Sequence, residues 1–141
     1  PWPPTSTSAI EGYQVEIAEQ EKMGLWHHSL LGKEHPKRKA RHLMTQAGEF
    51  ATIDEAGVRV NAKIDEDPAS VQEVCVDGEW NSLEITAVGN TLIQRINGKV
   101  FAVLVDRDQE LRTDKGWLAL QDHGKGCQVA FRNIRVRKLD F

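Results

Sequence analysis

An alternation of apolar and polar residues with a period of two constrains the fold of this chain more than any other feature of its sequence. In residues 13–17 the apolar side chains fall on one face and Gln14 and Glu16 fall on the other, which is the pattern of a half-buried strand. Residues 80–86 repeat the alternation, and residues 92–96 form a further expected strand. No long segment shows the 3.6-residue period of an amphipathic helix. The sequence therefore predicts an all-β fold.

Turn signals between the alternating runs predict how the strands connect. Asn97-Gly98 precedes the apolar run at residues 100–105, which predicts the return strand, and it predicts a two-residue hairpin of type I′, because both central residues of that turn need positive φ. Gly89-Asn90 marks another turn one strand earlier. Turns at this short spacing are typical of an all-β sandwich or barrel, and of the two we expect a sandwich of two antiparallel sheets.

Four further segments complete the set of expected strands. Residues 25–31 and 52–64 predict a second strand and a weak third one, and residues 117–123 and 128–139 predict the last two. In the final segment the apolar residues before Arg132 have the opposite parity to those after Asn133. A β-bulge at this point would bring both sets to one face. The alternative is a strand whose two ends are covered on opposite faces.

Composition and charge limit the class of protein. The chain has 141 residues, with 40% hydrophobic and 28% charged residues and a formal net charge of −3, which is ordinary globular composition. We expect a single sandwich domain over residues 1–141, with an extended Pro/Ser/Thr-rich lead at residues 1–11 and a basic loop at residues 32–51. No run of about 18 apolar residues predicts a membrane span.

The basic stretch at residues 33–41 holds five positive charges and one negative charge. Contact with nucleic acid would use such a cluster, but no aromatic residue is interleaved with it and the whole chain is acidic. We therefore expect a solvated loop and no nucleic-acid partner. Cys75 and Cys127 form either one disulfide or two buried thiols, and spacing alone does not decide between them.

Three segments, taken in order, carry a resemblance to a known family. They read Gly-Tyr-Gln-Val-Glu-Ile at residues 12–17, Gly-Glu-Trp-Asn-Ser-Leu-Glu-Ile at residues 78–85, and Gly-Trp-Leu-Ala-Leu-Gln-Asp-His-Gly at residues 116–124 with Phe-Arg-Asn-Ile at residues 131–134. This order resembles the 3-keto-disaccharide hydrolase domain family, and the resemblance covers residues 12–31 and 78–139.

The resemblance implies a concanavalin-like jelly roll of two curved sheets and a periplasmic or secreted location. Family domains carry further strands ahead of the first of these segments, and no residues here match them. The chain also opens with a proline-rich stretch and shows no signal peptide. We therefore expect an N-terminally truncated domain whose sheets are completed by a partner chain or a homo-oligomer.

The resemblance further implies cleavage of 3-keto-glycosides by C2 proton abstraction, β-elimination and hydration. Such a reaction needs an acid/base with a pKa near neutrality. His123 is the natural candidate, since an unperturbed imidazole has a pKa of about 6.5, and Glu16 is a second one. A divalent metal ion would stabilise the enediolate. Glu16 and His123 are its candidate ligands, although no candidate ligands have a diagnostic metal spacing.

The alternation predicts which side chains would contact the sugar. Gln14 and Glu16 in the first strand, and Trp117 and Gln121 with His123 in a later one, have the parity opposite to their apolar neighbours. We expect Gln14, Glu16, Gln121 and His123 to share one hollow, with Trp117 either a sugar platform or a core residue.

Three other residues are weaker candidates for the site. Arg132 is a further candidate sugar contact, although a structural role, in which it pairs with a carboxylate or holds the bulge, is favoured. His27 and His28 point to opposite faces of one strand, so at most one of them reaches the site.

The alternative function is a non-catalytic carbohydrate-binding or scaffold module of the same fold.

Overall fold

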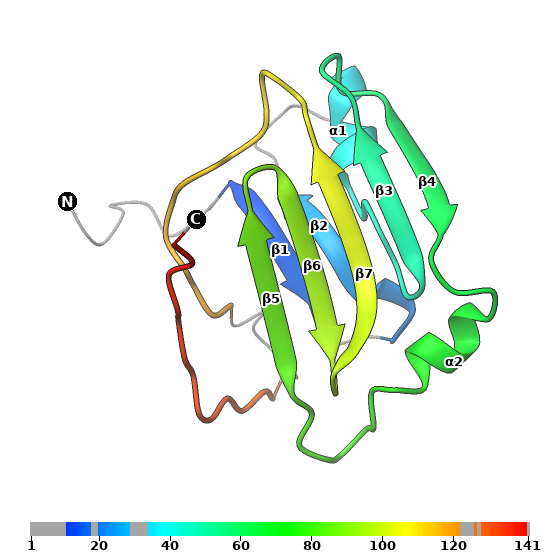
Figure 1. Cartoon of the computed structure of the whole chain (residues 1–141), viewed down its shortest axis with the longest axis vertical. Coiled ribbons are helices and arrows are strands. Elements are labelled where there is room, and N and C mark those ends of the chain that lie inside the picture. Colours follow the sequence, from blue (N-terminus) through cyan, green and yellow to red (C-terminus); the bar gives the residue numbers. More distant parts are fainter. Residues whose placement is uncertain (1–10, 18–19, 29–33, 122–125, 127, 141) are drawn as a thin grey trace.

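The structure is a computed structural model, and it describes residues 11–17, 20–28, 34–121, 126 and 128–140. In this part of the chain, seven strands form two sheets that lie one behind the other (Figure 1). The smaller sheet pairs β1 (Gly12–Glu16) with β2 (Gly24–His28). The larger sheet has the strand order β4-β3-β7-β6-β5 and consists of β3 (Glu49–Ile53), β4 (Arg59–Lys63), β5 (Leu83–Val88), β6 (Thr91–Ile96) and β7 (Lys99–Asp106).

The predicted all-β sandwich is confirmed, and so are its two hairpins. Asn97 and Gly98 both have positive φ, at 49° and 82°, and they join β6 to β7 in the predicted type I′ turn. Gly89 has a φ of 57° between β5 and β6. One pairing differs from the expected antiparallel pattern, because β3 and β7 run parallel. A parallel pair needs a long crossover, and here β4, α2 (Pro68–Gln72), β5 and β6 all lie between the two strands in sequence.

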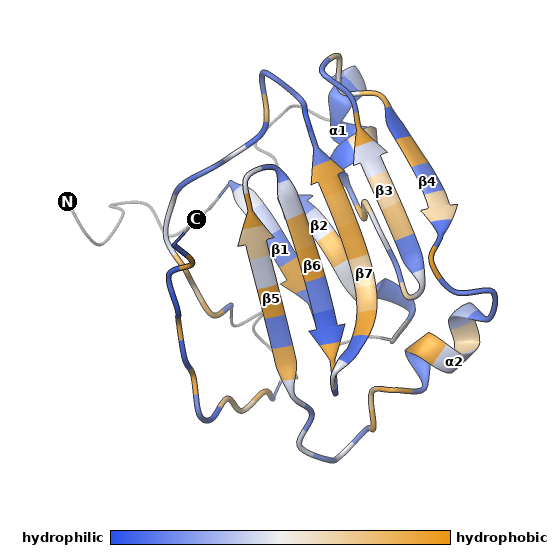
Figure 2. Cartoon of the chain, viewed as in Figure 1, coloured by the Kyte–Doolittle hydropathy of each residue, from blue (hydrophilic) through white to orange (hydrophobic). Residues whose placement is uncertain are grey.

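The hydrophobic core lies between the sheets. Ala51 on β3 and Leu104 on β7 face each other in the parallel pair, and both are fully buried. Figure 2 shows that β7, the central strand of the larger sheet, is apolar along most of its length. Burying each large apolar side chain contributes about 1.5–3 kcal/mol, and the core contains Met23, Leu25, Met44, Ala51, Ile53, Val71, Ile96, Phe101, Ala102 and Leu104.

The smaller sheet is narrower than the larger one and leaves part of the inner face open. Leu83 and Ile85 on β5 pair with Ile96 and Gln94 on β6, two residues that are buried in the core. Both β5 side chains are nevertheless 42% exposed. Two strands at about 4.8 Å spacing cannot cover a face that is five strands wide.

The last two predicted strands are wrong for the residues that the structure describes. Residues 117–121 and 128–140 contain no strand, and Trp117 and Val136 are 78% and 79% exposed. Alternation alone does not make a strand, because its backbone also needs a neighbouring edge to pair with. The change of parity is not produced by a β-bulge either, since Asn133 takes a left-handed φ of 55° outside any strand.

Two other segments also differ from expectation. Residues 52–64 form parts of two strands, because Asp54 Oδ1 accepts from the Ala56 and Val58 amides and turns the chain between β3 and β4. Residues 32–51, predicted as a basic loop, contain the helix α1 (Pro36–Arg41) and the start of β3. Pro36 stands at the first turn, where a proline is tolerated.

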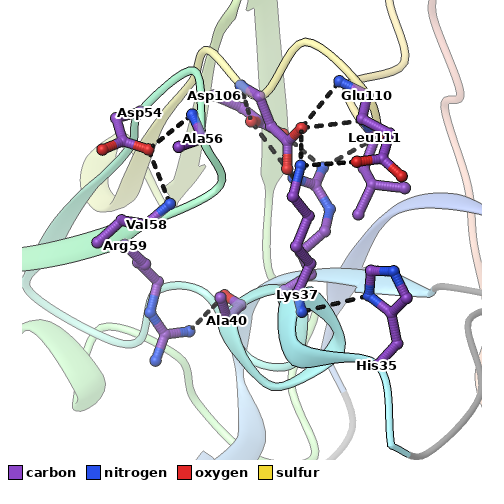
Figure 3. A network of polar contacts seen from close by, with 12 residues as sticks. His35, Lys37, Ala40, Asp54, Ala56, Val58, Arg59, Asp106, Glu110 and Leu111 are labelled. Carbon is purple, nitrogen blue, oxygen red and sulfur yellow. Dashed lines mark hydrogen bonds and ion pairs between the residues drawn. The ribbon is translucent and has the colours of Figure 1, made fainter.

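A buried polar network ties α1 to the end of β7 (Figure 3). Arg41 is fully buried, and its Nη2 donates to Asp106 Oδ2 at 2.5 Å. The Tyr13 hydroxyl donates to the same carboxylate, and burial together with this hydrogen bond raises the pKa of Tyr13. Lys37 Nζ lies 3.1 Å from Asp108 and 2.9 Å from Glu110. The network explains why a basic segment becomes a docked helix.

The structure also bears on membrane-spanning helices and on the two cysteines. Within the described residues, no helix has the length and apolar character needed to cross a membrane. Cys75 is a half-buried free thiol, and burial raises its pKa. Cys127 lies outside the described residues.

Candidate active site

Gln14 and Glu16 lie together on the outer face of the two-stranded sheet. Their neighbours Tyr13 and Val15 pack against the core, so alternation turns the two polar side chains outward. Gln14 Nε2 donates to Glu16 Oε2 at 3.0 Å, and the Ile17 amide donates to Glu16 Oε1 at 3.2 Å. Both carboxylate oxygens are therefore held by donors from the same strand.

Trp26 adds an aromatic ring to this face. It is the cross-strand partner of Gln14, and its neighbours Leu25 and His27 are buried with 1% and 3% exposure, so the indole points outward. Its Nε1 donates to the Lys22 carbonyl at 2.8 Å, which fixes the ring. The indole of Trp26 thus lies in a defined orientation across the sheet from the Gln14 amide.

Two exposed imidazoles border the same face. His28 is exposed at the end of β2, opposite Gly12. His42 is exposed directly after α1, and its ring centroid lies 4.4 Å from that of Trp26 with an angle of 85° between the planes. Gly24 is the cross-strand partner of Glu16, so β2 places no side chain opposite that carboxylate.

The outer face therefore combines an amide, a carboxylate, an indole and two imidazoles. An aromatic ring offers an apolar platform to the C–H face of a sugar, and amide and imidazole groups both donate and accept hydrogen bonds. A carboxylate and an imidazole are the usual acid/base groups at neutral pH. This set of groups suits a hydroxyl-rich ligand that undergoes proton transfer.

His27 does not belong to this face. It points into the core, where its ring packs edge-on against Tyr13 at 5.2 Å. Burial, with a contribution from Arg41, lowers the pKa of His27 to about 4. Of the two adjacent histidines, His28 is the one on the outer face.

The other predicted site residues belong to the C-terminal part of the chain. Trp117 and Gln121 are exposed on the C-terminal segment, which forms no strand there, so no sheet holds them in register with Glu16. The Arg132 guanidinium stacks on the Trp80 ring at 3.9 Å. This stacking is neither the carboxylate pair nor the bulge contact expected of Arg132, and its role toward a sugar stays a prediction. His123 lies outside the described residues.

Sequence reasoning missed Trp26 and His42. Trp26 could have been found, because its parity in residues 25–31 is that of His28 and opposite to that of Leu25. His42 carries no such signal. It follows a basic segment, and only the fold brings it to Trp26.

The described residues do not form a ligand set for a metal ion. Among them, no group of three or more His, Cys, Asp or Glu side chains is close enough to hold one. Glu16, one of the two expected ligands, is hydrogen-bonded by Gln14 and by the Ile17 amide. The other, His123, lies outside the described residues, so the divalent metal ion stays a prediction.

A shallow groove elsewhere on the molecule suits the expected ligand less well. It has a volume of about 400 Å³ and lies between η1 (Gln20–Lys22), β3 and α2. Its lining includes Glu49, but Glu49 Oε2 already accepts from the Gln46 amide and from Asn61. Among the described residues that line the groove, none is aromatic.

The comparisons with known proteins agree with the fold and with the predicted family. The family model described as the 3-keto-alpha-glucoside-1,2-lyase-like domain matches residues 3–137. No curated protein and no solved structure matches the chain significantly. A match over nearly the whole sequence, together with the all-β sandwich fold, shows that this chain belongs to the 3-keto-alpha-glucoside-1,2-lyase-like domain family.

Proposed function

We propose that this domain cleaves 3-keto-glycosides by elimination and hydration on the outer face of the β1-β2 sheet. The observation that carries the proposal is the hydrogen-bonded pair of Gln14 and Glu16, 3.0 Å apart, with Trp26 across the strand. The family supports the carbohydrate theme. A periplasmic or secreted location fits a glycoside substrate.

The reaction follows from the chemistry of a ketone at C3. The ketone acidifies the hydrogen on C2, so a base removes that proton and the electron pair forms an enolate. Collapse of the enolate expels the substituent at C1. This leaving group takes up a proton, and the sugar becomes an enone. Water then adds to C1, and a proton returns to C2. The net result is hydrolysis of the glycosidic bond.

The residues on the face take distinct roles in this proposal. Glu16 accepts the C2 proton, and the Gln14 amide together with the Ile17 amide orients its carboxylate. Trp26 supports the sugar ring, and its fixed indole limits how the sugar can lie. His28 donates hydrogen bonds to the substrate. His123 keeps the acid/base role that the family resemblance implies.

A second candidate function is sugar binding without chemistry. The openness of the face favours it, because His28 and His42 are exposed and Glu16 is only partly buried. Elimination is usually helped by excluding water from the reacting groups. A platform of indole and imidazole on an open sheet would suit a binding module.

A direct assay tests the proposed reaction. We expect the protein to release the aglycone from a chromogenic 3-keto-glucoside. Glu16→Gln should lower the rate by about 10²–10⁴-fold, the usual contribution of a general base. The matched control is Glu84→Gln on β5, an exposed strand carboxylate that pairs with Arg95 at 3.1 Å, which should retain the wild-type rate.

The outcomes separate the two functions. Equal turnover by wild type and Glu16→Gln would remove Glu16 from the mechanism. Binding of the substrate without any turnover by wild type, measured by quenching of tryptophan fluorescence, would establish the binding module instead.

A further inference from the structure

We infer that His42 is a substrate-binding residue of this site, contacting a hydroxyl-rich sugar ring that lies on Trp26. The inference rests on the proposed function, because it assigns a role at the same face. It concerns a segment that the sequence predicts to be only a solvated basic loop.

The first observation is the contact between the two rings. The imidazole and the indole lie 4.4 Å apart at nearly a right angle. A perpendicular pair forms a corner in which one ring supports the apolar face of a sugar and the other meets its edge. His42 is exposed, so its ring nitrogens are accessible to the hydroxyl groups at that edge.

The second observation is that the backbone around His42 is held firmly. Arg59 Nη1 on β4 lies 3.0 Å from the Ala40 carbonyl and 2.7 Å from the Leu43 carbonyl (Figure 3 shows the Ala40 contact). It also reaches the His42 carbonyl at 3.4 Å. One guanidinium thus binds the carbonyl groups on both sides of the imidazole.

The third observation is that the following residues cross β2 beside Trp26. The Met44 amide donates to the Leu25 carbonyl at 2.8 Å, and the Leu25 amide donates to the Thr45 carbonyl at 3.0 Å. These bonds place the chain that carries His42 at the edge of the strand that carries Trp26. The two rings are therefore held on neighbouring, hydrogen-bonded backbones.

The backbone strain at Leu43, the residue after His42, also supports a role for His42 in the site. Leu43 has a φ of 44°, a conformation that is unfavourable for a bulky side chain. Strain of this kind persists only where the surroundings impose it, and it gathers at functional sites. Here Arg59 and the contacts to Leu25 impose it directly after His42.

The anchor on the other side of His42 is the buried pair of Arg41 and Asp106. A buried ion pair adds little net stability but defines a position well. The backbone of this exposed histidine is thus held on both sides, by the buried ion pair of Arg41 and by the bonds of Arg59 to the Ala40 and Leu43 carbonyls. Orientation of this kind matches the needs of ligand recognition.

Kinetics with a methyl 3-keto-glucoside test the inference. His42→Ala should raise KM about tenfold, the loss of roughly one hydrogen bond to the ligand, and leave kcat within about twofold. His42→Gln preserves folding and some hydrogen bonding, so its KM should lie between those of His42→Ala and wild type. The matched control is His35→Asn at the start of α1, which keeps a side-chain acceptor for the Lys37 amide and should behave as wild type.

Each result decides the question. An unchanged KM in both His42 variants, with wild-type turnover, overturns the inference and leaves the proposed function standing. A fall in kcat at constant KM also overturns it, because His42 would then act in the chemistry. A wild-type protein that neither turns over nor binds the glucoside overturns the proposed function itself. Binding by Glu16→Gln that is lost in Glu16→Gln/His42→Ala supports the inference without turnover.

Discussion

At the scale of single residues, one strand sorts two neighbouring histidines into different environments. His28 is exposed, whereas His27 lies in the core with 3% exposure and with no hydrogen-bond partner for either ring nitrogen among the described residues. Burial lowers the pKa of His27 to about 4, so the ring stays neutral in the folded protein at neutral pH. A buried neutral histidine makes folding sensitive to acid.

The pH dependence of stability should therefore carry a contribution from His27. Its pKa is lower in the folded state than in the unfolded state, so the unfolded chain binds a proton that the folded protein refuses. The free energy of unfolding should fall as the pH drops from about 6.5 to about 4, by up to about 3 kcal/mol. Urea denaturation of wild type and His27→Leu at several pH values measures this, and parallel pH profiles would contradict it.

At the scale of elements, the structure depends on how closely segments approach β2. The chain at Thr45 crosses so near Gly24 that a Cβ on Gly24 would lie 1.9 Å from the Thr45 carbonyl oxygen. The φ of Gly24 is 149°, which also favours glycine. The same crossing brings His42 to Trp26, so a glycine on β2 permits the corner of the site to form.

Gly24→Ala should destabilise the protein by more than about 2 kcal/mol, because both the backbone conformation and the space oppose a side chain. Gly116→Ala is the matched control, since nothing lies within 4 Å of a Cβ there and its φ is not in the left-handed region. Thermal unfolding of the two variants measures the difference. Similar Tm values would show that the Thr45 segment can shift away from β2.

At the scale of the whole molecule, the two layers and α1 meet at one buried carboxylate. Asp106 at the end of β7 accepts from Arg41 on α1 and from Tyr13 on β1. Removing one partner of a buried ion pair costs about 3–5 kcal/mol, and among the described residues the buried Arg41 would keep, without Asp106, only the longer ion pair to Asp108 Oδ2 at 3.6 Å. An exposed pair is worth about 0–1 kcal/mol, since water screens it.

Asp106→Asn should accordingly destabilise the fold by about 3–5 kcal/mol. Glu84→Gln should change stability by no more than about 1 kcal/mol, because Glu84 is 66% exposed in its pair with Arg95. Chemical denaturation of both variants at neutral pH compares them. Equal losses would mean that Asp106 does not anchor the layers.

Features that depend only on neighbouring residues could be predicted from the sequence. Period-two alternation sends residues i and i+2 to one face whatever the strand pairs with, so Gln14 and Glu16 could be placed together from sequence. The turn at Asn97-Gly98 is equally local, because its backbone conformation depends on those two residues alone. These features needed no knowledge of distant segments.

Contacts between distant segments decided the rest. Residues 117–121 carry apolar residues typical of a strand, yet they form no strand, because a strand also needs backbone pairing and this segment pairs with no edge of the described sheets. Helix α1 formed in a basic stretch because Asp106, 65 residues from Arg41, lies within the core to receive its charge. His42 follows α1 directly, so the docking of this helix also brings His42 to Trp26. The sequence determined which face each strand residue takes, and the tertiary structure decided which segments had a partner to face.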